Sequence, residues 1–166
     1  MNQSNIPYIF LACSALFFTV SLTAAGYNAA GPSTAEMLTA VNDARFDSGL
    51  QPVKLNKRLS AAAEARAFDM INNGYFDHEN LAGELPWRVI EGKNYSFLHA
   101  GENLAINYSD AKNVISAWLN SPAHETNLLN PLFSETGVSV VSVGSGNEQK
   151  TLIVELFAAP QPEPEE

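Results

Sequence analysis

Cysteine is almost absent from this chain. Of its 166 residues only Cys13 carries a thiol, and it lies inside an apolar N-terminal run. Once that run is removed, the rest of the chain can form no disulfide, no cysteine-based zinc site and no thiol nucleophile. A domain without disulfides depends on its apolar core, and hydrophobic residues make up 46% of the chain.

Charged side chains are missing from Met1 to Ala35. The stretch Ile6–Ala25 is almost continuously apolar and is followed by small residues, so we predict a signal peptide over residues 1–25 and a short linker over residues 26–34. No Lys or Arg precedes the run, and about 20 apolar residues can also span a bilayer, so an uncleaved membrane anchor is the alternative. Either outcome places the rest of the chain outside the cytoplasm, as a secreted, extracellular, periplasmic or membrane-anchored protein.

Basic residues are scarce as well. Lys and Arg number 9 against 18 Asp and Glu, which gives a formal net charge of −9 at pH 7. Because nucleic acids and anionic lipid surfaces repel such a chain, we expect no nucleic-acid partner and no electrostatic binding to a membrane; only the leader is expected to engage one. The roughly 140 residues after the leader suit one domain with one core, and we expect a monomer.

The first half of the remaining chain shows helical patterns. Ser33 and Glu36 have the spacing of a capping box, which predicts a helix that begins there and ends at Gly49. A second helix is predicted over residues 56–73, with alanines along its inner face. Gly, Pro and Asn then interrupt the sequence repeatedly, which predicts a long irregular loop with one short helix at Pro86–Glu91.

The second half changes from helical to strand patterns. Ser109 is predicted to cap a third helix, and Ser121 followed by Pro122 is a start signal for another. Two segments rich in β-branched residues, 136–145 and 151–159, predict an antiparallel hairpin.

Together these elements predict an α+β domain over residues 35–159, with helices packed on a small, mainly antiparallel sheet. The last residues, 160–166, contain no apolar side chain to bury, so we predict a disordered acidic tail.

Three residues are candidates for chemistry: His78, Glu102 and His124. If Ser121 caps a helix, His124 is the third helical residue, where the helix dipole favours the neutral imidazole that can ligate a metal or accept a proton. Two imidazoles and one carboxylate can bind zinc or another divalent cation and leave one position open. The three residues are far apart in the sequence and no H-E-x-x-H motif is present, so an ordinary structural role stays open for each, as it does for His99.

Several segments, in a fixed order, resemble a known family. They are "MLTAVNDARFDSGLQPVKLNKRLSAAAEARAFDM", "YFDH", "GENLA" and "AWLNSPAHETNLLNPLFSETGVSVV". The chain resembles bacterial members of the CAP superfamily, which groups cysteine-rich secretory proteins, antigen 5 and pathogenesis-related 1 proteins and is also called the SCP-like extracellular domain. The resemblance covers roughly Ala35 to Phe157, nearly all of the chain after the predicted leader.

This resemblance implies an α-β-α sandwich with a central cleft. In the family the cleft is typically lined by two histidines and two acidic residues, and several members bind a divalent metal there, often zinc. His78 matches the first histidine, Glu102 the acidic residue of the "GEN" segment, and His124 the second histidine. The second acidic residue is missing, because Ser121 stands in its place, and Glu125 stands where relatives usually have arginine.

Three functions stay open. The first is an exported domain whose cleft around His78, Glu102 and His124 binds a lipid or cell-envelope ligand, with or without a divalent metal. The second is a metal-dependent, protease-like hydrolase that uses the same residues as ligands or general base. The third is a surface interaction module with a relic cleft. The missing second acid and the lack of a nucleophile motif favour binding over catalysis, without deciding whether the protein is an enzyme.

Overall fold

The computed structural model describes residues 31–144 and 149–162. The predicted signal peptide, most of the predicted linker and the last residues of the predicted tail lie outside these ranges. Within the described ranges, no helix has the length and apolar character needed to cross a membrane.

A sheet of four strands in the order β1-β3-β4-β2 forms the middle layer. The strands are β1 (Lys54–Leu55), β2 (Phe97–Ile106), β3 (Glu135–Val143) and β4 (Lys150–Pro160). β4 runs antiparallel to both β2 and β3, whereas the short β1 is parallel to β3. The predicted strand pair is thus present as β3 and β4, and the prediction of a small, mainly antiparallel sheet is confirmed.

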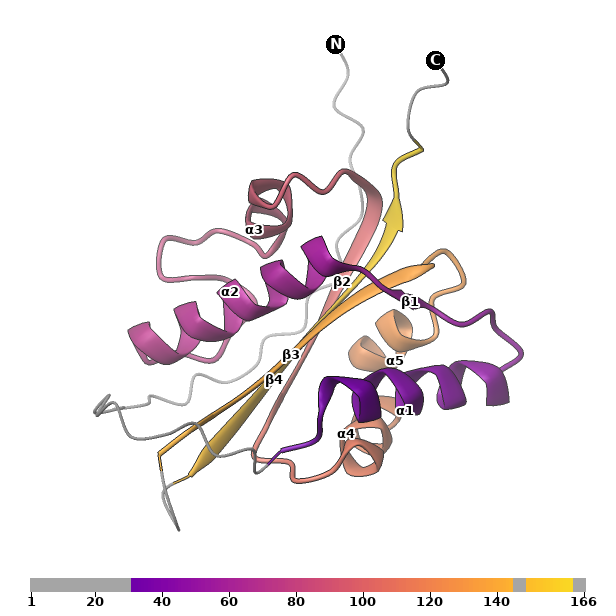
Figure 1. Ribbon diagram of the computed structural model, residues 1–166, viewed down its shortest axis with the longest axis horizontal. Coiled ribbons are helices and arrows are strands. Elements are labelled where there is room, and N and C mark those ends of the chain that lie inside the picture. Colours follow the sequence, from indigo (N-terminus) through magenta and orange to yellow (C-terminus); the bar gives the residue numbers. More distant parts are fainter. Residues whose placement is uncertain (1–30, 145–148, 163–166) are drawn as a thin grey trace.

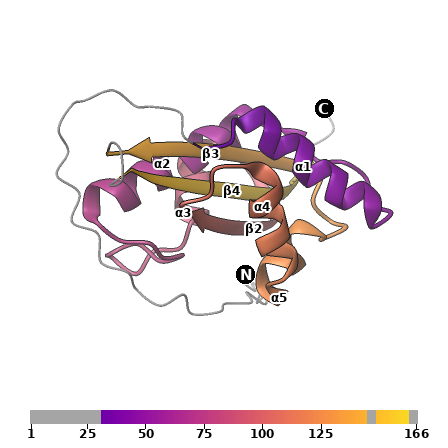
Figure 2. The same ribbon diagram turned by 90° about the horizontal axis from the view of Figure 1, so that it is seen from below.

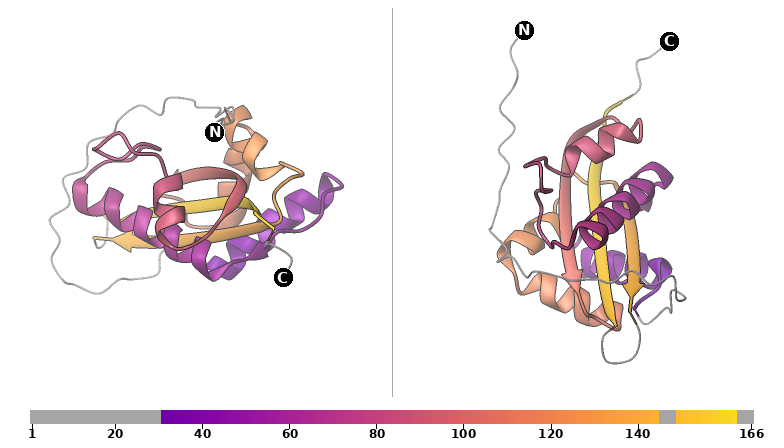
Figure 3. Two further views of the ribbon diagram at one scale, coloured as in Figure 1. Left: turned by 90° about the horizontal axis from the view of Figure 1, so that it is seen from above. Right: turned by 90° about the vertical axis from the view of Figure 1, so that its left-hand side faces the viewer.

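Helices cover both faces of this sheet. They are α1 (Thr34–Asp47), α2 (Lys57–Asn73), α3 (Trp87–Gly92), α4 (Ala111–Leu119) and α5 (Pro122–Leu128). Figure 1 shows α2 and α3 on one side of the strands and α1, α4 and α5 on the other, and the turned views in Figure 2 and Figure 3 show the same three layers. The α+β prediction, with an α-β-α sandwich, is therefore confirmed.

The central strand β4 is buried on both faces and separates two apolar cores. Leu152, Val154 and Leu156 pack against α2 and α3. Ile153 and Phe157 pack against α1, α4 and α5. Because successive side chains of a strand point to opposite faces, a nearly continuous apolar run is what a strand between two helical layers requires.

Local capping follows the sequence signals with one correction. The Ser33 hydroxyl accepts a hydrogen bond from the Glu36 amide at 3.2 Å, and the Glu36 carboxylate accepts one from the Ser33 amide at 2.7 Å, so the capping box is present. The prediction that Ser109 caps α4 is wrong, because Asp110 accepts the hydrogen bond of the Asn113 amide at 2.9 Å. Aspartate caps as well as serine, and its negative charge also suits the positive end of the helix dipole.

Candidate functional site

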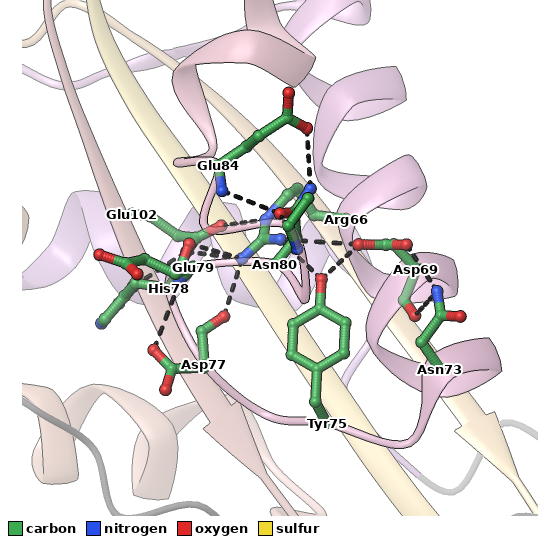
Figure 4. A network of polar contacts seen from close by, with 11 residues as sticks. Arg66, Asp69, Asn73, Tyr75, Asp77, His78, Glu79, Asn80, Glu84 and Glu102 are labelled. Atoms are coloured by element: carbon green, nitrogen blue, oxygen red, sulfur yellow. Dashed lines mark hydrogen bonds and ion pairs between the residues drawn. The ribbon is translucent and has the colours of Figure 1, made fainter.

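Arg66 lies on the inner face of α2 and makes a buried ion pair with Glu102 on β2. Its Nε is 3.0 Å from Glu102 Oε2, and each side chain is only 1% exposed. Its Nη2 donates to the backbone carbonyls of Asp77 at 2.8 Å and His78 at 3.0 Å. Figure 4 shows Arg66 in the middle of this network, between α2, β2 and the loop after α2. Arg66 therefore holds both the carboxylate of Glu102 and the backbone at His78 in place.

His78 stands at the outer end of this network. Its Nδ1 lies 2.9 Å from Glu102 Oε1, and its side chain is 19% exposed, against 1% for Glu102. A carboxylate paired with a guanidinium can only accept, so Nδ1 of His78 carries a proton whether the ring is neutral or charged. The lone pair of the neutral imidazole is then on Nε2, the atom that Glu102 does not use. This is the arrangement in which a histidine is ready to bind a metal ion or accept a proton.

Asp69 on α2 and Tyr75 in the loop after α2 extend the network. Arg66 Nη1 donates to the Tyr75 hydroxyl at 3.0 Å, and that hydroxyl in turn donates to Asp69 (Figure 4). Burial and the hydrogen bond to Asp69 raise the pKa of Tyr75. Burial opposes the charge on Arg66, but the Glu102 carboxylate outweighs it and the pKa of Arg66 is raised. The guanidinium is therefore charged at every ordinary pH.

The other side of the site is built by α5, which is tied to β2. Asn103 Nδ2 donates to the carbonyl of His124 at 3.0 Å. Asn127 Nδ2 donates to the carbonyl of Glu102 at 3.1 Å and to Asn103 Oδ1 at 3.0 Å. A Cβ atom at Gly101 would lie 2.6 Å from Asn127 Oδ1, so a larger residue there would displace the Asn127 side chain that joins α5 to β2. The Gly-Glu-Asn segment is thus a docking point for α5.

His124 is half-buried on α5. Its ring centroid is 6.4 Å from that of Trp118, whose Nε1 donates to the Leu104 carbonyl at 3.1 Å. Burial, and then the nearby charge of His78, lower the pKa of His124. The ring is consequently neutral at pH 7 and the two histidines lie within electrostatic reach of each other.

The structure thus brings His78 and Glu102 into direct contact and places His124 on the neighbouring helix. His99 is exposed and lies three positions before Glu102 on β2, so its side chain leaves the opposite face of the strand. Ser121 lies immediately before α5, but its side chain makes no capping hydrogen bond. Glu125 is exposed on α5. Across the described residues, no group of three or more His, Cys, Asp or Glu side chains is arranged to hold a metal ion.

Arg66 is the residue that the sequence reasoning missed. It belongs to the same helical face as Ala62, Ala63, Ala67 and Met70, all of which are buried. A charged residue on an apolar helical face must be paired if it is buried, and this was the available signal.

Two comparisons of the sequence agree with the fold. The family described as "Cysteine-rich secretory protein family" (CAP) matches residues 38–157. The chain is 36% identical over 104 residues to the Bacillus subtilis (strain 168) protein YkwD. This alignment covers 63% of this chain and 40% of YkwD. It is 35% identical over 109 residues to the membrane protein YlbC of the same strain, covering 65% of this chain and 31% of that protein. The chain therefore spans less than half the length of these relatives.

Solved structures have the same fold. An outer surface protein from Borrelia burgdorferi superposes with a TM-score of 0.67 at 24% identity, over 75% of this chain and 90% of that chain. An extracellular protein containing a SCP domain from Bacillus anthracis str. Ames superposes with a TM-score of 0.63 at 26% identity, over 75% of this chain and 40% of that chain. Sequence and fold together establish that this chain belongs to the cysteine-rich secretory protein (CAP) family.

Proposed function

We propose that this chain is an exported binding protein that holds a divalent metal ion, with zinc as the first candidate, between His78 and His124 and uses it to bind a lipid or cell-envelope ligand. The observation that carries the proposal is the buried chain from Arg66 through Glu102 to His78. A metal-binding histidine typically donates its other ring N–H to a carboxylate, as His78 Nδ1 does to Glu102. A histidine that only filled space would not need a buried ion pair to orient it.

The donor set fits a partly open metal site. Glu102 uses Oε2 for Arg66 and Oε1 for His78, so we assign it the role of orienting carboxylate, where the sequence alone suggested a third ligand. His78 and His124 remain as the two imidazole ligands, and His124 is neutral at pH 7 because its pKa is lowered. A zinc ion held by two imidazoles would supply positive charge and open positions for oxygen donors such as a phosphate or carboxylate group.

A metal-dependent hydrolase is the weaker alternative for this site. Such an enzyme needs a general base within hydrogen-bond reach of the attacking water. Glu102 is buried and engaged by Arg66 and His78, and Ser121 stands where a second acid would be. The geometry therefore supports ligand binding more than hydrolysis.

Zinc uptake by the exported protein tests the proposal. We expect about one zinc per chain at pH 7.5, and at least tenfold weaker binding in His78→Ala and in His124→Ala, measured by calorimetric titration. Glu102→Gln should weaken zinc binding about 10–100-fold, as for other orienting carboxylates. His99→Ala is the matched control and should bind zinc like the unmodified protein. Equal zinc uptake by all four variants, or none by the unmodified protein, would contradict the metal site.

Ligand binding is measured with a defined probe. Short-chain phosphatidic acid, kept below its micelle concentration, carries a phosphate and an apolar tail. We expect it to bind the zinc-loaded protein and to lose affinity when zinc is removed by a chelator or when both histidines are replaced by alanine. Binding that survives both treatments would place the ligand away from the histidines.

A further inference from the structure

A groove with a volume of about 810 Å³ runs between α1 and α4. The two helices lie side by side on the face of the sheet opposite α2 (Figure 1), and the groove shares no residue with the site around His78. Its apolar side chains are short on α1, with Ala40 and Ala44, and longer on α4, with Ile115 and Leu119. Leu119 is 36% exposed, although leucine is usually buried. The groove is therefore an apolar surface without a covering element among the described residues.

Carboxylates line the groove on its α1 side. Glu36, Asp43 and Asp47 are exposed and follow one another along the helix at intervals of seven and four residues, which places them on one face. Asp110 adds a further carboxylate at the start of α4, and Lys112 is the one basic residue among those that line the groove. The hydrogen bonds from Ser33 lower the pKa of Glu36, so this carboxylate is charged at neutral pH. The occupant must therefore combine an apolar surface with positive charge.

The length of the groove indicates the kind of occupant. Its lining residues on α1 run from Ala35 to Asp47, which corresponds to about 18 Å of helix at 1.5 Å per residue. A compact cation would reach only one or two of the carboxylates along this length. A helix laid parallel to α1 could place an apolar stripe on Ala40, Ala44 and Ile115 and basic side chains against the whole row of acids. The free carboxylate of a fatty acid would be repelled by the same row.

We propose that the groove between α1 and α4 binds a basic amphipathic helix of a partner protein. The apolar stripe of that helix contacts the groove floor, and its Lys or Arg side chains pair with Glu36, Asp43 and Asp47. This proposal does not depend on metal binding, because the two sites have no residue in common.

A synthetic peptide provides the probe. It has fourteen residues, with leucines at helical spacing on one face and lysines on the other, and a fluorescent label. Fluorescence anisotropy with the exported protein should show saturable one-to-one binding that weakens as salt is added. The double variant Asp43→Asn/Asp47→Asn should bind about tenfold more weakly. Both positions are exposed, and far-UV circular dichroism confirms that the variant is folded.

The controls separate the groove from the overall negative charge. Glu64→Gln/Glu91→Gln removes the same charge from exposed positions on α2 and α3, so it should bind the peptide like the unmodified protein. A peptide with glutamate in place of lysine should not bind. Ala40→Leu fills the groove floor and should weaken peptide binding without removing any charge. Equal losses in the two charge variants, or equal binding of both peptides, would overturn the proposal.

Discussion

Arg66 is a charged residue on the buried face of α2, and it organises the candidate site. It is 1% exposed on a helix face where it lies beside Ala62, Ala63 and Ala67, whose small side chains leave room for a guanidinium. Its five N–H groups reach Glu102, Tyr75 and the carbonyls of the loop that carries His78. A lysine has one compact ammonium and could not hold all these acceptors at once.

Removing the Arg66 charge should lower the free energy of unfolding of the protein. In Arg66→Met the Glu102 carboxylate stays buried without the guanidinium and keeps only its contact with His78, so we expect a loss of about 3–5 kcal/mol in the free energy of unfolding, measured by urea denaturation. The double variant Arg66→Met/Glu102→Gln removes both charges and should recover a large part of that loss. Arg88→Met, at an exposed position of α3, is the control and should change stability by less than about 0.5 kcal/mol. A double variant as unstable as Arg66→Met would contradict the ion-pair explanation.

Glu155 is a second buried acid, in the centre of β4. It is 0% exposed, its neighbours across the sheet are Asn103 and Val138, and its Oε2 has no hydrogen-bond partner among the described residues. The Thr136 hydroxyl lies 2.9 Å from Oε1 and 3.0 Å from the Leu156 carbonyl. Since that hydroxyl has one proton and a carbonyl only accepts, a protonated Glu155 completes the chain of hydrogen bonds. Burial raises the pKa of Glu155 to about 8.

This acid should make stability depend on pH. The folded protein holds the proton of Glu155 up to a pH of about 8, whereas the unfolded chain releases it near 4.5. The stability that Glu155 contributes is therefore complete below pH 4.5 and is lost as the pH rises to about 8, by about 1 kcal/mol per pH unit. Urea denaturation from pH 5 to pH 8 should show this loss in the unmodified protein and in the exposed control Glu91→Gln. It should be absent from Glu155→Gln, and an identical slope in that variant would contradict the assignment.

At the scale of elements, α2 lies very close to β3 at Gly137. A Cβ atom at Gly137 would lie 2.1 Å from the backbone carbon of Leu59 and 2.3 Å from the Ser60 nitrogen. Both atoms belong to the first turn of α2, so no side chain can move aside to make room. The glycine therefore sets the distance between the sheet and its main covering helix.

Gly137→Ala should push α2 away from the sheet. Overpacking of this kind costs about 1–3 kcal/mol or more in the free energy of unfolding. Gly92→Ala is the control, because a Cβ atom there meets nothing within 4 Å, and it should leave stability nearly unchanged. Thermal and urea unfolding of the two variants measure the difference. Equal stabilities would mean that α2 can shift without cost.

At the scale of the whole molecule, the candidate site joins both helical layers. His78 belongs to the loop that follows α2, whereas His124 belongs to α5, and β2 lies between them with Glu102 and Asn103. A ligand that bridges the two histidines must therefore stabilise the packing of both layers on the edge of the sheet.

Zinc should accordingly raise the stability of the folded protein. A ligand that binds only the folded state adds about 2.7 kcal/mol at a free concentration 100 times its dissociation constant. We expect a rise in the melting temperature with added zinc for the unmodified protein and for His99→Ala. The variant His78→Ala/His124→Ala should show no rise. A rise of the same size in all three proteins would indicate zinc binding elsewhere.

The predictable part of the fold was local. The capping box at Ser33, the end of α2 at Gly74, the start of α5 at Pro122 and the β-branched strands β3 and β4 all follow from short-range patterns. β2 was not predicted, because Gly101, Glu102 and Asn103 are residues that strands usually avoid. β2 is paired with β4 from Phe97 to Ile106, and this pairing outweighs the local preference.

The candidate site, like the fold, was only partly predictable from the sequence. The sequence by itself determined which residue types are available for the site, namely the histidines His78 and His124 and the acid Glu102. It also showed that Ser121 occupies the position of a second acid, and the family pattern indicated that these residues belong together. Only the tertiary structure decided their roles, because Glu102 meets Arg66 and His78 through contacts between residues 24 and 36 positions apart. Such contacts depend on how layers pack, and packing energy is spread over whole elements. Local sequence patterns therefore fix where helices and strands begin, while the partner of each buried charge is fixed only when the layers come together.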